Sequence, residues 1–239
     1  ESEQYFDKEF DQFLADRSIT GTCPKCGAED AYGDQCEKCG SALSPTELIN
    51  PVSKLSGKIP ELKKTTHWYL PLDRHEKWLR EWIENGKYKD RQLHNVQDWK
   101  NQVVGQCMSW IKSGLQPRAI TRDLDWGVKV PLKNAEGKVL YVWFDAPIAY
   151  ISSTIDWATS KKESTDYWKS WWLNEHGARD VHYVQFMAKD NIPFHTLSFP
   201  ATLLGANQSW KLVDYIKGFN WLTYEGGKLS TSQKRGVFM

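Results

Sequence analysis

Residues 139–147 have the sequence Val-Leu-Tyr-Val-Trp-Phe-Asp-Ala-Pro, and this stretch decides the predicted fold. Six apolar residues in a row are typical of a strand that is buried on both faces of a parallel sheet. The Asp-Ala-Pro that follows predicts the end of this strand. Ile148, Ile151 and Ile155 then lie at helical spacing. A strand, a turn and a helix in this order indicate an α/β fold.

The same arrangement occurs again further along the chain. Residues 181–187 are a second predicted strand, which is followed by residues 188–191 and by a helix that includes Pro193 and His195. Residues 211–216 are a third strand candidate. In an open α/β sheet, ligands bind outside the carboxyl ends of the strands. We therefore expect residues 145–147 and 189–195 to face one crevice that holds the chemistry.

Four cysteines form two Cys-x-x-Cys pairs separated by nine residues: Cys23, Cys26, Cys36 and Cys39. Gly27 and Gly40 follow the pairs, which predicts tight turns around a closed, structural zinc site with Zn–S bonds of about 2.3 Å. Two disulfides are the less favoured alternative, because the sequence shows no signal peptide, has an odd fifth cysteine and is large enough to fold without them. Residues 21–43 are too few to bury a core, so we expect the metal to hold this knuckle together.

Apolar residues at helical spacing predict three more helices, over residues 5–15, 73–85 and 96–112. Cys107 lies on the apolar face of the last of these. It has no partnering base nearby in the sequence, so we expect a buried thiol rather than a nucleophile.

The composition indicates a soluble globular protein, which we expect to be cytoplasmic. The 239 residues are 40% apolar, enough for a real core, and no apolar run approaches the roughly 18 residues of a membrane span. A formal charge of +1 argues against the coating of a nucleic acid over a wide surface. Most of the 13 tryptophans are expected to be core residues.

The chain closes with Glu-Gly-Gly-Lys-Leu-Ser-Thr-Ser at residues 225–232, followed by Gln-Lys-Arg-Gly. Two glycines before a lysine and small hydroxyl residues predict a mobile loop that can close donors and positive charge around phosphates. Alone, such a loop is more typical of a solvated turn. It becomes specific together with residues 141–147 and with Phe-Met-Ala-Lys-Asp-Asn-Ile-Pro-Phe-His at 186–195.

With these motifs, the zinc knuckle and Thr-Arg-Asp-Leu-Asp-Trp at 121–126, the sequence resembles the methionyl-tRNA synthetases, a family of class I aminoacyl-tRNA synthetases. The resemblance covers the whole chain in collinear order. It implies a Rossmann-like parallel sheet with an inserted four-cysteine zinc-knuckle domain. It also implies a two-step reaction, in which methionine and ATP give methionyl-adenylate and the acyl group then passes to tRNA(Met).

The resemblance implies four segments. Residues 1–17 would be a helix that ends the first Rossmann half. Residues 18–116 would form the connective insertion, with the knuckle at 21–43. Residues 117–225 would form the second Rossmann half, and residues 226–239 would form the signature loop. The His-x-Gly-His or His-x-Gly-Asn signature of class I enzymes is absent from the sequence, and no anticodon-binding domain follows Met239. We therefore expect a fragment that is inactive alone.

The resemblance also implies which residues bind methionine. Aromatic rings suit the polarisable thioether of this ligand, and the O–H of Tyr150 and the ring N–H of His195 are expected to donate to its sulfur. The complete pocket would consist of Trp143, Ala146, Pro147, Tyr150 and His195.

For ATP with its Mg²⁺, the resemblance assigns the ribose to Asp190 and to the backbone of Ala188. Lys228 would stabilise the charge that develops on the α-phosphate. Thr231 stands where many family members have a second lysine, so either Lys234 or Arg235 compensates or pyrophosphate is held less tightly. No cysteine in residues 50–64 supplies a second knuckle, so we expect one zinc.

Two alternatives remain. One is a class I synthetase for another amino acid, although cysteinyl enzymes need an open zinc position and valyl or isoleucyl enzymes need a longer editing insertion. The other is a non-catalytic zinc-ribbon module that binds RNA, although Lys25 and Lys38 are offset by four nearby acidic residues. The sequence leaves the oligomeric state open.

Overall fold

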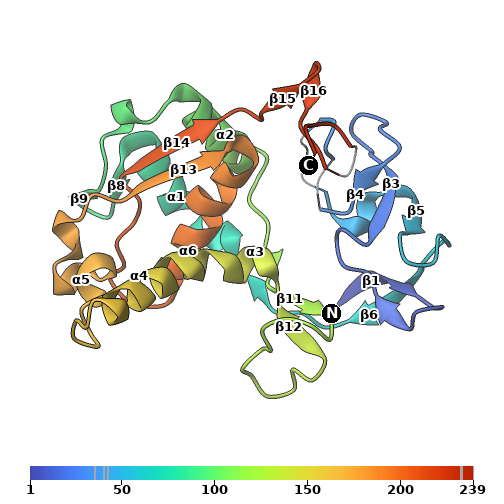
Figure 1. Cartoon of the computed structure of the whole chain (residues 1–239), viewed down its shortest axis with the longest axis horizontal. Coiled ribbons are helices and arrows are strands. Elements are labelled where there is room, and N and C mark those ends of the chain that lie inside the picture. Colours follow the sequence, from blue (N-terminus) through green and yellow to red (C-terminus); the bar gives the residue numbers. More distant parts are fainter. Residues whose placement is uncertain (35, 40, 42, 232–233, 239) are drawn as a thin grey trace. The chain divides into compact units, whose positions relative to one another are not determined.

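The structure, a computed structural model, describes residues 1–34, 36–39, 41, 43–231 and 234–238. The chain divides into two compact units, and Figure 1 labels most of their longer helices and strands. The first unit comprises Glu1–Leu70 and Arg118–Asp145, and the second comprises Pro71–Pro117 and Ala146–Met239. The insertion expected at residues 18–116 therefore contributes to both units.

The first unit consists mainly of short antiparallel strands. One sheet has the order β2-β1-β6 and another the order β4-β3-β5, while β11 pairs with β12 and β7 with β10. The elements are β1 (Ser2–Asp7), β2 (Gln12–Phe13), β3 (Ile19–Thr22), β4 (Ala31–Tyr32), the 3-10 helix η1 (Pro45–Glu47), β5 (Ile49–Ser53), β6 (Glu61–Thr65), β7 (Tyr69–Leu70), β10 (Arg118–Ala119), β11 (Thr121–Asp123), β12 (Lys138–Leu140) and α3 (Val142–Asp145).

The helix predicted over residues 5–15 is wrong, because these residues form β1, a turn and β2. Asp7 ends β1 and accepts hydrogen bonds from the backbone of Glu9 (3.0 Å) and from the hydroxyls of Ser53 and Ser56. These hydroxyl bonds lower the pKa of Asp7 to about 2. β1 also pairs with β6, more than fifty residues away. The pattern of apolar residues in 5–15 cannot show that residues 61–65 will pair with this segment. The pairing of β1 with β6 outweighs the helical spacing of these apolar residues.

The parallel strand predicted over residues 139–144 is also wrong. β12 ends at Leu140 and pairs with β11 in antiparallel register. The N–H of Tyr141 then donates to the carbonyl of Ile120 (2.8 Å), and the chain turns directly into α3. A short apolar run fits a strand and a helix equally well, and here it is divided between them.

The second unit holds the longer helices. Its elements are η2 (Leu72–His75), α1 (Glu76–Asn85), β8 (Lys87–Tyr88), β9 (Arg91–Gln92), η3 (Val96–Asp98), α2 (Asn101–Lys112), η4 (Ala146–Ile148), α4 (Ala149–Ser160), α5 (Lys169–Trp172), η5 (Asn174–His176), η6 (Ala178–Asp180), β13 (Val184–Ala188), η7 (Lys189–Asn191), the π-helix η8 (Phe194–Ser198), α6 (Phe199–Gly205), β14 (Tyr215–Phe219), β15 (Thr223–Tyr224) and β16 (Gly227–Lys228). Within the described ranges, no helix has the length and apolar character needed to cross a membrane.

The predicted helices of this unit are present, with differences in where they begin and in helix type. The helix predicted over residues 73–85 begins as the 3-10 helix η2, and α1 itself starts at Glu76. α1 buries Leu79, Trp82 and Ile83 and ends at Gly86, whose φ of 70° suits glycine. The predicted helix over 96–112 is broken near its start. Trp99 is extended there, because its indole N–H donates to the carbonyl of Asp214 at 2.8 Å.

β13 and β14 form one parallel pair, as the two strand candidates at 181–187 and 211–216 led us to expect. β14 begins four residues later than predicted. One face of the pair is buried, and a Cβ at Gly218 would lie 2.9 Å from side chains of Ile192 and Val103. The other face exposes Phe186 and Phe219, whose rings stack at 6.5 Å.

Candidate functional site

The four cysteines of the knuckle converge on one point. Their Sγ atoms all lie within 4.8 Å of one another, with Cys23 and Cys39 at 3.9 Å and Cys26 and Cys36 at 3.6 Å. Four sulfurs around a zinc ion at about 2.3 Å would be about 3.8 Å apart. A disulfide needs about 2.05 Å, and all four thiols are free. The cluster therefore fits a tetrahedral metal site and not the disulfide alternative.

Backbone turns orient these sulfurs. Gly27 has a φ of 71° and donates its N–H to the carbonyl of Cys23 (2.9 Å), while the N–H of Lys25 points at the Cys23 sulfur (3.4 Å). Gly40, expected to do the same for the second pair, lies outside the described residues. Hydrogen bonding to Ser41 lowers the pKa of Cys39 to about 6.

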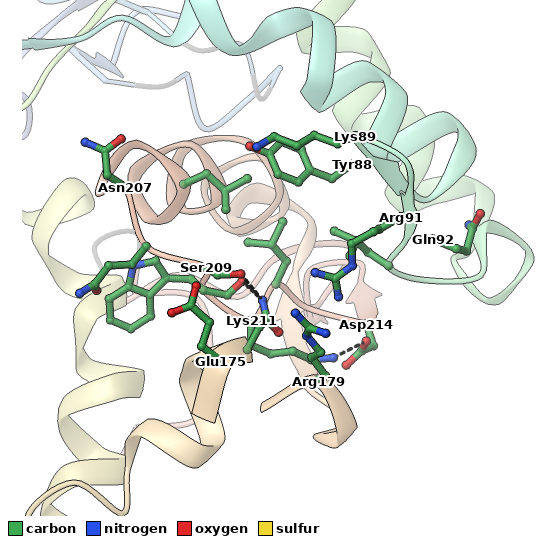
Figure 2. Close-up of a pocket in the computed structure, with 16 residues that line it drawn as sticks. Tyr88, Lys89, Arg91, Gln92, Glu175, Arg179, Asn207, Ser209, Lys211 and Asp214 are labelled. Carbon is green, nitrogen blue, oxygen red and sulfur yellow. Dashed lines mark hydrogen bonds and ion pairs between the residues drawn. The ribbon is translucent and has the colours of Figure 1, made fainter. Parts of the chain in front are cut away.

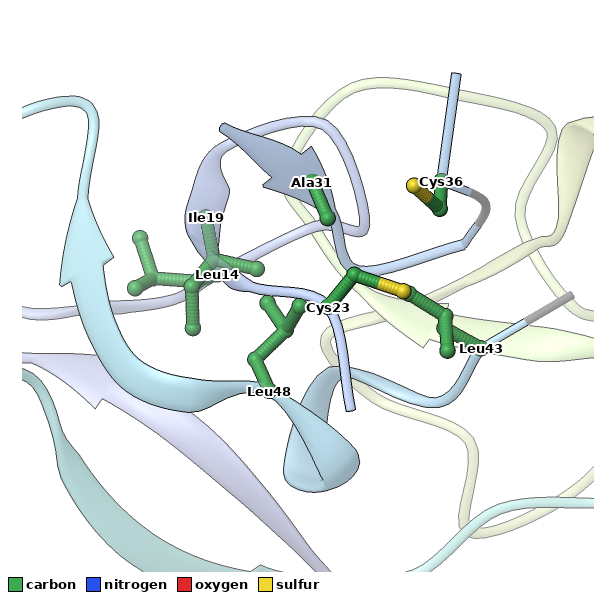
Figure 3. Close-up of a cluster of buried hydrophobic side chains, with 7 residues drawn as sticks. All are labelled: Leu14, Ile19, Cys23, Ala31, Cys36, Leu43 and Leu48. Carbon is green, nitrogen blue, oxygen red and sulfur yellow. The ribbon is translucent and has the colours of Figure 1, made fainter. Parts of the chain in front are cut away.

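The knuckle has more apolar support than the sequence suggested. Seven buried side chains form one cluster, which Figure 3 shows around the Cys23 and Cys36 sulfurs. Three of its members, Leu14, Ile19 and Leu48, lie outside residues 21–43. The expectation of a knuckle held by metal alone is therefore corrected, since packing by Leu14, by Ile19 of β3 and by Leu48 contributes as well. The full cluster is Leu14, Ile19, Cys23, Ala31, Cys36, Leu43 and Leu48.

Tyr150 and His195, two of the predicted methionine ligands, are in direct contact. Tyr150 lies on α4 and His195 on the π-helix η8, a rare geometry that often marks functional sites. The Tyr150 hydroxyl lies 2.9 Å from Nε2 of His195, and Nδ1 of His195 lies 2.9 Å from the carbonyl oxygen of Asn191. The helix predicted here is thus present, but in its π form.

These contacts fix the protons of the pair. A carbonyl oxygen can only accept, so Nδ1 of His195 carries the ring proton and Nε2 accepts from the Tyr150 hydroxyl. Burial lowers the pKa of His195, which keeps the ring neutral near pH 7. Both protons that were expected to point at a thioether are therefore already used. A ligand sulfur would meet these rings by dispersion, or would have to displace the Tyr150 hydroxyl.

The other predicted pocket residues lie on two further elements. Ala146 and Pro147 lie on η4, directly before α4, with Pro147 buried. Trp143 lies on α3 in the first unit rather than at a strand end, and it is half-buried. Its membership of the pocket stays a prediction.

Ala188 and Asp190 lie where β13 ends, as predicted. Oδ1 of Asp190 is buried and accepts no hydrogen bond from any residue that the structure describes. Asp190 can therefore accept a hydrogen bond from a ligand. It lies at the carboxyl end of the parallel pair, where ligands bind in α/β folds.

The signature segment begins with a tight hairpin. Tyr224 pairs with Gly227 and Thr223 with Lys228. The two turn residues, Glu225 and Gly226, have φ values of 48° and 76°, which is the type I′ geometry favoured in two-residue hairpins. Lys228 is therefore carried on a strand.

Trp221 connects this hairpin with the end of β13. Nζ of Lys228 lies 4.3 Å from the centre of the Trp221 ring, and Nζ of Lys189 lies 4.1 Å from it. Both are cation–π distances. Lys189 precedes Asp190, so the two motifs that the resemblance assigned to ATP meet at one ring. Trp221 had no distinguishing signal in a sequence with 13 tryptophans.

A second turn follows Lys228. Ser230 and Arg235 exchange backbone hydrogen bonds of 2.9 Å in both directions. The Arg235 guanidinium lies over Gly227, and a Cβ at residue 227 would overlap it. Thr231 and Lys234 are exposed, and residues 232 and 233 lie outside the described part of the chain.

Cys107 is a buried thiol, as predicted, 3.0 Å from Oγ1 of Thr196, and burial raises its pKa to about 12.

The 121–126 motif contains a buried charge cluster of the first unit. Burial alone would raise the pKa of Asp123, but hydrogen bonds from His67, Lys138 and Thr65 outweigh it and lower this pKa to about 2. These bonds tie β11 to residues on β6 and β12 and to His67.

Comparison with known proteins was made across the whole chain. The sequence profile described as tRNA synthetases class I (M) matches residues 1–239. The methionine–tRNA ligase of Bacteroides fragilis is 53% identical over 238 residues, and that of Cytophaga hutchinsonii is 52% identical over 242 residues. Both matches cover all of this chain but only 32% and 33% of the relatives, so the chain spans about a third of their length.

Solved structures support the fold. A Mycobacterium tuberculosis methionyl-tRNA synthetase bound by methionyl-adenylate superimposes with a TM-score of 0.54 at 16% identity, covering 98% of this chain and 37% of that one. A second structure of this enzyme, in complex with methionyl-adenylate, gives 0.53 at 18% identity, covering 97% and 36%. From the profile match over its full length and the identity with these relatives, we conclude that the chain belongs to the class I (M) family of tRNA synthetases.

Proposed function

We propose that this chain is the central part of an enzyme that activates methionine with ATP to methionyl-adenylate and transfers it to tRNA(Met). The observation that carries the proposal is the meeting of Lys189 and Lys228 on Trp221, next to Asp190. In this proposal, the two lysines would bind phosphate and Asp190 would hold the ribose, at the carboxyl end of the parallel pair, where ligands bind in α/β folds. The chain would work within a longer, cytoplasmic protein, where a four-thiol site stays reduced.

A segment graft tests this proposal. Residues 1–239 would replace the matching segment of the Bacteroides fragilis relative, and methionine-dependent exchange of pyrophosphate into ATP would be measured. We expect exchange with methionine and none with valine or cysteine. A folded graft that exchanges pyrophosphate with another amino acid would show that the proposed substrate is wrong.

In the first step, the carboxylate of methionine attacks the α-phosphate of ATP and pyrophosphate leaves. We propose that Asp190 and the backbone of Ala188 hold the ribose, and that Lys228 stabilises the charge that develops on the α-phosphate. Mg²⁺ that arrives with ATP would neutralise phosphate charge. The role of Asp190 agrees with its buried oxygen, which lacks a donor among the described residues.

We further propose that Cys23, Cys26, Cys36 and Cys39 hold one structural zinc ion. The sulfur separations of 3.6 and 3.9 Å suit a tetrahedron of thiolates. All four positions would be filled by the protein, which leaves none for a substrate. Arg17, on the same unit, is paired with Asp34 (2.9 Å) and Glu37 (3.4 Å), which reduces the positive charge near the knuckle that an RNA-binding module would need.

The parallel pair β13–β14 would belong to a larger Rossmann-like sheet, the second half of which residues 117–225 would provide, with the signature segment at 226–239. In such a sheet, helices cover both faces. The exposed face with Phe186 and Phe219 is consistent with this, because large stacked aromatic side chains are rarely left in water without a function. Residues 18–116 would correspond to the connective insertion and residues 1–17 to the end of the first half.

The methionine pocket would comprise Trp143, Ala146, Pro147, Tyr150 and His195. In the grafted synthetase, we expect Tyr150→Phe and His195→Ala each to raise the KM for methionine several-fold more than the KM for ATP. Tyr150→Phe removes the hydroxyl that orients the His195 ring, and His195→Ala removes a ring that would contact the thioether. Steady-state kinetics with each substrate varied in turn measures this. Tyr167→Phe, in the same unit but outside the pocket, is the matched control. Equal effects on the two substrates would indicate a disturbed fold, and unaltered kinetics would remove these residues from the pocket.

Arg235 is the better candidate to replace the second lysine of the family, since its guanidinium lies over Gly227 next to Lys228, whereas Lys234 is exposed. We expect Arg235→Ala to slow adenylate formation about 10-fold or more, the scale of one charge-assisted hydrogen bond. Lys234→Ala should have little effect. Pre-steady-state adenylation of both variants and of the double variant measures the difference. Wild-type rates in all three would show that Thr231 needs no compensating cation.

A further inference from the structure

The second unit contains a cavity that the proposed reaction does not use. Its volume is about 550 Å³, and its walls come from the β8–β9 hairpin, from η5 and η6, and from residues 204–214. Figure 2 shows the side chains that line it. Asp214 lies directly before β14, so the cavity lies at the amino end of the parallel pair. Asp190 and Ala188 lie at the opposite, carboxyl end.

The cavity is rich in positive charge. Four cationic side chains line it, Lys89, Arg91, Arg179 and Lys211, against two acidic ones, Glu175 and Asp214. The whole chain carries a formal charge of only +1. A local excess of positive charge in an almost neutral protein raises the concentration of anions at that place.

The acidic residues do not neutralise the two arginines. Asp214 is already engaged, since it accepts from Nζ of the buried Lys211 at 2.8 Å and from the backbone N–H of Tyr183 at 2.7 Å. Neither Arg91 nor Arg179 has a carboxylate within 4.0 Å in the described part of the chain. In Figure 2, both guanidinium groups point toward the same part of the cavity. Two unpaired arginines thus line one polar cavity.

We propose that this cavity binds phosphate groups. A guanidinium presents a planar set of N–H donors that matches phosphate oxygens in pairs, and the two arginines together can hold a multiply charged anion. The remaining polar lining, which includes the side chains of Gln92, Asn207 and Ser209, offers further hydrogen bonds. A cavity of this size accommodates a small molecule with several phosphates, and the same chemistry is present in an RNA backbone.

Titration calorimetry with inorganic pyrophosphate tests the proposal on the zinc-loaded chain. Every protein in this experiment also carries Lys228→Ala, so that the signature hairpin does not contribute to the binding of pyrophosphate. We expect Arg91→Gln and Arg179→Gln each to weaken binding about 10-fold or more, as the loss of a charge-assisted hydrogen bond implies, and the double variant to abolish it. Arg74→Gln is the matched control, because Arg74 is an exposed arginine of the same unit that does not line the cavity. Circular dichroism verifies that each variant is folded.

A second arm uses a single-stranded RNA of about ten nucleotides in place of pyrophosphate. Binding of pyrophosphate that depends on Arg91 and Arg179 supports a site for free phosphates. Binding of the RNA alone with the same dependence supports the phosphate site and assigns its ligand to an RNA backbone. If the folded double variant binds both probes as tightly as the protein with intact arginines, or if that protein binds neither, the proposal is overturned.

Discussion

Substitution of Lys228 by alanine in the grafted synthetase should lower the rate constant of adenylate formation by about 100-fold or more, which is the effect of removing one preorganised donor from a developing oxyanion. Lys228 lies on β16, and its ammonium group is held 4.3 Å from the Trp221 ring. A cation held in this way does not have to be ordered at the moment of reaction. The affinity for ground-state ATP should change much less, because the charge on the α-phosphate develops only in the transition state.

Rapid-quench measurement of adenylate formation determines the rate constant and the ATP affinity separately. Lys228→Arg keeps the charge and should recover part of the rate, while Lys234→Ala removes an exposed lysine from the same segment and should leave the rate nearly unchanged. If Lys228→Ala forms adenylate at the wild-type rate, Lys228 is not the residue that stabilises the transition state. A loss of ATP affinity equal to the loss of rate would instead assign it to ground-state binding.

Substitution of Cys36 by alanine should cost the chain its zinc and unfold the knuckle. Cys36 is buried, and its sulfur lies 3.6 Å from that of Cys26, so its removal opens the metal shell and also leaves a gap in the cluster of Figure 3. The binding free energy of a structural zinc is largely folding free energy for its module. The helices of the second unit should remain folded, because they have their own buried side chains.

Zinc content by mass spectrometry and hydrogen exchange resolved by residue measure the two effects. Cys107→Ala is the matched control: this thiol is equally buried but contacts Thr196 instead of a metal site, so the variant should keep one zinc per chain. Fast exchange in residues 21–43 with slow exchange in α1 and α2 is the expected pattern. A Cys36→Ala variant that retains zinc and a protected knuckle would show that packing from Leu14 and Leu48 is sufficient.

The parts of the fold that the sequence predicted well are those decided by neighbouring residues. The first cysteine pair and its turn at Gly27 are local, and the stripe of Leu79, Trp82 and Ile83 faces one side of α1 whatever surrounds it. Distant partners decided the parts that were missed. β1 is a strand because of β6, and β12 is short because β11 pairs with it in antiparallel register. No local pattern in residues 5–15 or 139–144 distinguishes these outcomes.

The candidate site shows the same division. Asp190 and Lys228 were predicted as site residues from the resemblance to a family. In a family, motifs that lie far apart in the sequence belong to one site, so the resemblance predicts contacts that no local pattern shows. Trp221 was missed because its importance lies in the two lysines that approach it, from segments almost forty residues apart. The carbonyl of Asn191, which fixes the tautomer of His195, was missed because backbone atoms are the same at every position.

The contact between Arg235 and Gly227 links two positions of this segment that lie eight residues apart. A Cβ at residue 227 would overlap the Arg235 guanidinium, which is the far end of a flexible side chain. Such an overlap is relieved when the arginine takes another rotamer, with no change in the path of the backbone. A substitution at residue 227 would therefore displace a cation that lies next to Lys228, and its effect on activity would be exerted through Arg235.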